Sequence, residues 1–286
     1  MQTTARRPIG TRPRWTPTTI DAWLPPKRHT VGMPFEINLH IHDHLTGQDG
    51  DSLPGFPIWV EGERGDFELT TDQKAEALAA VLWFLDKVSG KLTLTAAGYL
   101  KPVDVEALSQ VLPEVARWYG KRNREDTTRP VADFRQAMKD FGLIRKVKGQ
   151  LVLTPAGRFF CDDPEGLWVF LGKKITPGSG TFEHDFVMLA LINTLAGHRW
   201  QHAVVCDQLT AMGWRHESGL PVQPSDLWPH ERQIRVIIDN MIPADVSWMH
   251  FDDTPMPIQA RAFAFQALTS DRQGVRTSYE SHPGAG

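Results

Sequence analysis

The apolar residues between positions 70 and 89 recur at helical spacing. Thr70 followed by Gln73 has the spacing of a capping box, which predicts that a helix begins at this threonine, and Gly90 favours its end. The preceding residues 35–69 alternate with period two between turn-like segments, which is typical of short strands. The helical positions that predict a buried face are Ala75, Leu78, Ala79, Leu82 and Leu85.

Residues 90–98 and 149–157 form an internal repeat with a constant offset of 59 positions. Each copy follows a predicted helix and reads as a glycine turn and a short strand with alternating leucines. In each copy a threonine after the strand, Thr95 or Thr154, is predicted to cap a following helix, and Pro155 suits the first helical position. The matched pairs are Leu92 with Leu151, Leu94 with Leu153, Thr95 with Thr154, Ala97 with Ala156 and Gly98 with Gly157.

The second copy predicts a helix followed by a β-hairpin. Pro130 begins an amphipathic stretch and Gly142 favours its end. Residues 143–147 and 150–153 then read as two strands joined across Lys148 and its neighbouring glycine. A helix followed by a hairpin is the core of a winged helix. The predicted fold class is therefore α+β and mainly helical, with tandem winged-helix-like modules and short β-hairpins.

These patterns divide the chain into five segments. Residues 1–34 are rich in Pro and Arg and bury little, so they are predicted to be disordered. The segments are 1–34, a disordered basic tail; 35–120, strands plus the first winged-helix-like repeat; 121–181, the second repeat, which is basic; 182–270, a helical module with helices at about 186–193, 203–212, 231–241 and 260–268; and 271–286, a disordered tail.

The net charge of −3 is the sum of unlike regions. Residues 1–28 carry +5 and residues 121–158 carry +6, whereas residues 29–120 carry −8 and residues 159–286 carry −6. Cationic blocks of this kind favour a phosphate-bearing partner.

The chain contains no apolar run long enough for a membrane helix, and its two cysteines are isolated, so we predict a cytoplasmic protein that binds no membrane and has no cofactor.

Several motifs resemble a family of actinobacterial mobile-element proteins. The resemblance covers residues 75–240 and rests on residues 91–100, 104–108, 141–152, 162–168 and 212–215. These segments are similar to the TnpR-like passenger proteins of insertion sequences and to the related plasmid open-reading-frame-three family. The resemblance implies a winged-helix fold and a link to a mobile element, and it implies no catalytic residue.

The cationic block of the second repeat is the predicted DNA-binding surface. A helix that enters a groove and a wing that touches phosphate would use such residues, and double-stranded DNA is the predicted partner. Asp133 and Asp140, on the same helix, oppose this reading because they would repel phosphate, and no aromatic residues interleave with the block. The predicted DNA-binding residues are Lys121, Arg122, Arg124, Arg129, Arg135, Lys139, Arg145, Lys146, Lys148 and Arg158.

Two other functions stay open beside a non-enzymatic DNA-binding accessory or regulator. The first is a protein–protein adaptor, or a homodimer, built on the same modules. The second is a metal-dependent enzyme that uses His40, His42 and His44, which alternate along a predicted strand, although a straight strand holds the outer two too far apart to share one metal ion. Hydrolase and phosphate-loop motifs are absent from the sequence, and acidic neighbours of Cys161 are expected to raise its pKa.

Overall fold

The computed structural model describes residues 67–178, 180–216, 218–246 and 255–269. The predicted tails, the strands before residue 67 and the three alternating histidines lie outside these ranges. The sheet-bearing part contains α3 (Ala79–Ser89), β1 (Leu92–Thr93), α4 (Pro102–Val111), α5 (Pro113–Ala116), the 3-10 helix η3 (Glu125–Thr127), α6 (Arg129–Asp140), β2 (Ile144–Val147), β3 (Gln150–Leu153) and α7 (Pro155–Phe160). The helical part contains α2 (Thr71–Ala77), α8 (Pro164–Ile175), α9 (Phe182–Leu195), α10 (His202–Ala211), α11 (Pro224–Leu227), α12 (Arg232–Asp239) and α13 (Ile258–Thr269).

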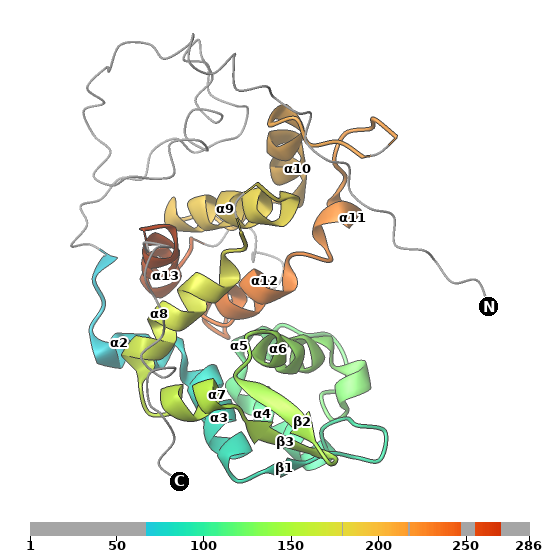
Figure 1. The fold of residues 1–286 in the computed structure, drawn as a ribbon, viewed down its shortest axis with the longest axis vertical. Helices are drawn as coiled ribbons and strands as arrows, with labels where there is room; N and C mark the ends of the chain where they lie inside the picture. Colours follow the sequence, from blue (N-terminus) through green and yellow to red (C-terminus); the bar gives the residue numbers. More distant parts are fainter. Residues whose placement is uncertain (1–66, 179, 217, 247–254, 270–286) are drawn as a thin grey trace.

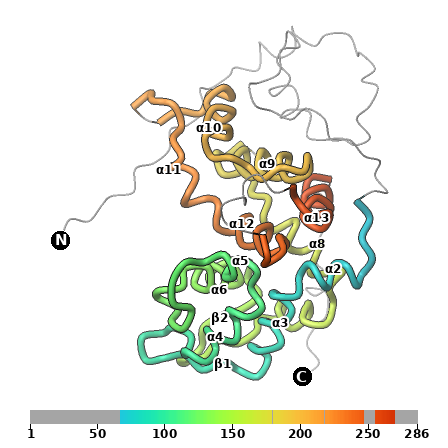
Figure 2. The backbone as a smooth tube through the Cα atoms, turned by 180° about the vertical axis from the view of Figure 1, so that it is seen from behind, coloured from blue at the N-terminus to red at the C-terminus, as the bar shows by residue number. Residues whose placement is uncertain are grey.

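The described chain is mainly helical, with one small antiparallel sheet, which agrees with the predicted α+β class. Figures 1 and 2 show the sheet and α3–α7 at one end of the molecule and α9–α11 with α13 at the other, while α12 lies between them. None of the described helices is both long enough and apolar enough to cross a bilayer.

The two copies of the repeat contribute strands to the same sheet. The strand order is β1-β3-β2, and Leu92 pairs directly with Leu151, its equivalent in the second copy. We expected short hairpins in tandem modules, but in the described chain the first copy supplies a two-residue strand that pairs with the second copy. So short a strand gains little stability alone and needs a neighbour to satisfy its backbone groups.

The local signals at helix ends are mostly confirmed. Thr70 forms the predicted capping box with Gln73 and begins α2, although a break at Leu78 separates α2 from α3. Thr154 accepts a hydrogen bond from the Gly157 N–H and caps α7.

The first copy differs from this pattern, because Thr95 does not cap a helix. Its hydroxyl accepts a hydrogen bond from the Tyr99 N–H, 3.1 Å away, and closes a turn. Gly98 stands in this turn at φ +87°, a left-handed conformation that interrupts a helix. The next helix, α4, begins later, at Pro102.

Helix α9 lies at the centre of the helical part. From Phe182 to Leu195 nearly every side chain is buried, as expected for a helix that is surrounded on all sides. Thr181 caps the helix by accepting from the His184 N–H. At the opposite end of the molecule, Phe84 of α3 and Phe134 of α6 meet edge to face.

Candidate nucleic-acid interface

The β2–β3 hairpin exposes three cationic side chains. Its turn places Lys148 at φ +47° and Gly149 at φ +76°, as in the two-residue turns that suit the twist of hairpin strands. Arg145, Lys146 and Lys148 are exposed, and within the described ranges none of them has a carboxylate partner. The predicted wing therefore carries its cations into solvent, and Figure 1 shows its tip at the end of the molecule remote from α9 and α10.

The three hairpin cations do not all point the same way. Successive strand residues face opposite sides, so Arg145 and Lys146 lie on opposite faces of β2. The Nζ atom of Lys146 lies beside Gly98, where it is 2.7 Å from the position that a Cβ atom would occupy. Lys148 lies at the turn between the two faces. The hairpin thus presents an edge of positive charge rather than a flat patch.

Helix α6 contributes less positive charge than its sequence predicts. We expected Arg135 and Lys139 to share an exposed face, but Arg135 forms an ion pair with Glu125 of η3, at 2.6 Å, and donates to the Gly98 carbonyl. Arg129 pairs with Asp133 one turn later, at 3.2 Å. Lys139 is exposed and has no such partner in the part of the chain that the structure describes.

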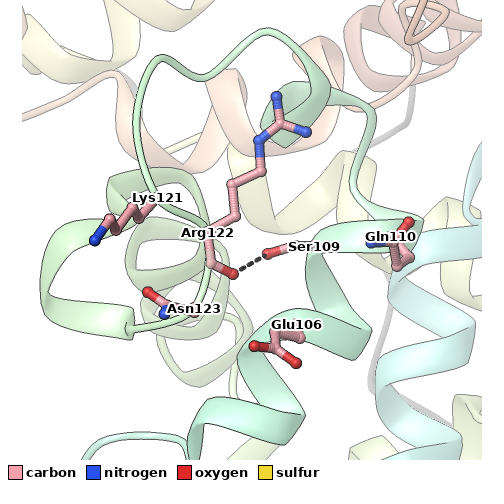
Figure 3. Close-up of a pocket in the computed structure, with 6 residues that line it drawn as sticks. All are labelled: Glu106, Ser109, Gln110, Lys121, Arg122 and Asn123. Atoms are coloured by element: carbon pink, nitrogen blue, oxygen red, sulfur yellow. Dashed lines mark hydrogen bonds between the residues drawn. The ribbon is translucent and has the colours of Figure 1, made fainter.

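The remaining predicted residues make contacts within the protein or line a hollow. Arg124 pairs with Asp126, and Arg158 donates to the Leu153 carbonyl. Arg122 donates to two carbonyls at the end of α5, so it helps to hold the loop that follows this helix. Lys121 and Arg122 line a shallow hollow of about 300 Å³ beside α4, which Figure 3 shows. Several of the ten predicted residues therefore make contacts within the protein, and DNA binding by the ten stays a prediction.

The acidic residues of α6 face α12. Asp133 contacts Arg232, at 3.2 Å, and Arg235, and Asp140 lies 3.9 Å from Arg232. These arginines neutralise the carboxylates that we expected to oppose phosphate binding. The same contacts cover this side of α6, so the helix cannot present it to a DNA groove while α12 stays in place.

The contact between α12 and the sheet-bearing part is largely buried. Arg235 also contacts Glu114 of α5, and burial raises the pKa of Glu114 to about 7 despite this cation. Arg117 donates to carbonyls at the carboxyl end of α12, including those of Asp239 and Ile242. This arrangement satisfies helix-terminal carbonyls that have no partner within the helix. It also joins the two parts of the molecule by charge and by hydrogen bonds.

Two other histidines each pair with a carboxylate. His202 lies 2.7 Å from Glu231, and His216 lies 2.7 Å from Asp226. No group of three His, Cys, Asp or Glu side chains suited to a metal ion occurs among the residues that the structure describes, which leaves His40, His42 and His44 untested. Burial and a hydrogen bond to Asp162 raise the pKa of Cys161, as the sequence predicted from its acidic neighbour.

Comparisons with protein-family models, with curated proteins and with solved structures found no match to this chain. The fold and the site therefore define its class only as a mainly helical α+β protein with a small antiparallel sheet and a cationic hairpin. The resemblance to mobile-element passenger proteins stays a prediction.

Proposed function

We propose that this chain is a non-enzymatic, DNA-binding accessory protein whose segment α3–β3 is one winged-helix-like unit. The order of elements supports this fold: a helix, a strand, further helices and then a hairpin, with β1 on the far side of β3 from β2. The link to a mobile element and the cytoplasmic location belong to the same proposal.

The observation that carries the proposal is the exposed hairpin. Arg145, Lys146 and Lys148 leave the sheet without carboxylate partners among the described residues, whereas Arg124, Arg129 and Arg135 each have one. Unpaired cations on a projecting hairpin can replace the counterions of phosphates, which is the main source of DNA affinity.

The covered side of α6 sets the mode of binding. Bases are read by side chains that enter a groove, whereas phosphate contacts position a protein without reading sequence. Because α12 occupies one side of α6, the hairpin is the proposed contact, and the expected binding depends on duplex phosphates more than on base sequence.

The test is binding of the full-length protein to a labelled random-sequence duplex, measured by fluorescence anisotropy across a salt series. Replacement of both hairpin lysines, Lys146→Gln with Lys148→Gln, is expected to lower the slope of log affinity against log salt by about 2. Lys174→Gln, an exposed lysine of α8, is the matched control and should leave the slope unchanged. Equal slopes for wild type and the double variant would contradict the proposal.

A protein–protein adaptor is the second candidate. The specific observation in its favour is that two large apolar side chains near α11, Leu220 and Trp228, are more than half exposed. If the chain associates through this surface, with itself or with another protein, Leu220→Ser with Trp228→Ser should reduce the molar mass measured by light scattering after gel filtration. A wild-type molar mass equal to that of one chain would exclude self-association.

A further inference from the structure

The loop between α5 and η3 holds an exposed aromatic ring beside cations. Tyr119 is 98% exposed, and Lys121, Arg122 and Arg124 follow it within five residues, all of them exposed. Tyr119 makes no ring contact with the rest of the described chain. An aromatic ring with cations around it is the combination that binds unpaired nucleotides, because every base has a face that can stack.

The exposure of Tyr119 does not come from an untethered loop. The carbonyl of Lys121 accepts a hydrogen bond from the buried Thr128 hydroxyl, at 3.2 Å. The guanidinium of Arg122 donates to the Ala116 carbonyl at 3.0 Å, and the Ser109 hydroxyl donates to the Arg122 carbonyl at 3.4 Å. The loop is thus attached to α4, α5 and the start of α6, while the tyrosine ring stays in solvent.

The hollow beside α4 is lined by polar groups, and three of its lining residues follow Tyr119 closely in the chain. Figure 3 shows Glu106, Ser109 and Gln110 of α4 on one side and Lys121, Arg122 and Asn123 of the loop on the other. The amide and hydroxyl groups can donate and accept, as the edges of an unpaired base require. Glu106 repels phosphate, so the cationic loop side is the one that suits the nucleotide backbone.

We propose that this loop binds an unpaired nucleotide of the nucleic acid that the hairpin holds, with the base stacked on Tyr119 and the adjacent phosphate near Lys121. The inference rests on the proposed function. Helix α6 begins shortly after the loop and ends shortly before the hairpin, and its 12 residues span about 18 Å. One turn of duplex spans about 34 Å, so a single nucleic acid can touch both elements.

The test compares three labelled probes by anisotropy with the full chain: a blunt duplex, the same duplex with a short thymidine gap, and the single strand. Wild type is expected to bind the gapped duplex roughly tenfold more tightly than the blunt one. Tyr119→Ala should remove that preference without changing affinity for the blunt duplex, and Tyr119→Phe should keep it. Ile258→Ala, an exposed apolar side chain of α13, is the matched control and should behave as wild type.

The outcomes separate the two proposals. Equal affinity of wild type for blunt and gapped duplex, unchanged by Tyr119→Ala, overturns the role of the loop and leaves DNA binding by the hairpin intact. A preference for the gap that depends on Tyr119, together with blunt-duplex binding that ignores Lys146 and Lys148, supports the loop and overturns the hairpin. Failure to bind any of the three probes overturns both.

Discussion

The β2–β3 hairpin and the contact between α6 and α12 both gather cationic side chains, but they differ in what surrounds those cations. Arg235 lies between the carboxylates of Glu114 and Asp133 and is mostly buried, whereas Lys146 and Lys148 lie in solvent without a carboxylate partner among the described residues. The difference teaches that the count of basic residues in a segment does not define a binding surface. The carboxylates brought to each cation by the fold decide whether it stabilises the protein or remains available to a partner.

The largest expected effect on the free energy of unfolding comes from removing the cation at the centre of the buried contact. Arg235→Ala leaves Glu114 and Asp133 without their main partner, and loss of one member of a buried ion pair costs about 3–5 kcal/mol. The free energy of unfolding, measured in urea, should fall by that amount. Arg232→Ala is the matched control, because Arg232 is more exposed and should cost less than about 1 kcal/mol. Equal losses for the two variants would show that the contact has no buried centre.

A second variant tests whether Arg135 belongs with the buried cations, although the sequence placed it on the DNA-binding surface. Its partner Glu125 is 2% exposed and also accepts a hydrogen bond from the Leu100 N–H. Arg135→Ala should lower the free energy of unfolding by about 3 kcal/mol and leave the salt dependence of duplex binding unchanged. If Arg135→Ala lowers the salt slope of duplex binding and leaves the free energy of unfolding unchanged, Arg135 contacts DNA.

The sequence predicts those features of the fold whose interacting residues lie close together along the chain. The capping box at Thr70, the extent of α6 and the turn at Lys148 all follow from residues within a few positions of one another, and the structure confirms them. The sequence predicted the hairpin cations for the same reason.

The contacts between α6 and α12 have no local signal in the sequence. The residues Asp133 and Arg232 lie 99 positions apart, and only the packing of α12 on α6 brings them together. The sequence does not predict a role for Tyr119, which stands just before the cationic block. The ring of Tyr119 is exposed whereas its neighbour Trp118 is half-buried, and only the fold shows this difference.

The third prediction uses pH. Because burial raises the pKa of Glu114 to about 7, the folded protein binds its proton more tightly than the unfolded chain, where the pKa is near 4.5. The stabilisation from this proton is complete below about pH 4.5 and is lost as pH rises through 7. Relative to Glu114→Gln, which does not titrate, the wild type should lose on the order of 2–3 kcal/mol between pH 5 and pH 8. A constant difference across this range would show that Glu114 stays ionised beside Arg235.

The smallest expected effect concerns single exposed lysines, one on the hairpin and one on α6. Lys148→Ala removes one cation from the hairpin tip, so the salt slope of duplex binding should fall by about 0.9 while the free energy of unfolding changes by less than about 0.5 kcal/mol. Lys139→Ala is the matched variant, because Lys139 is also exposed but lies on α6. If α12 keeps α6 away from the duplex, Lys139→Ala leaves the slope unchanged. If both variants lower the slope equally, the duplex contacts α6 and the hairpin together, and the interface extends along the exposed edge of that helix.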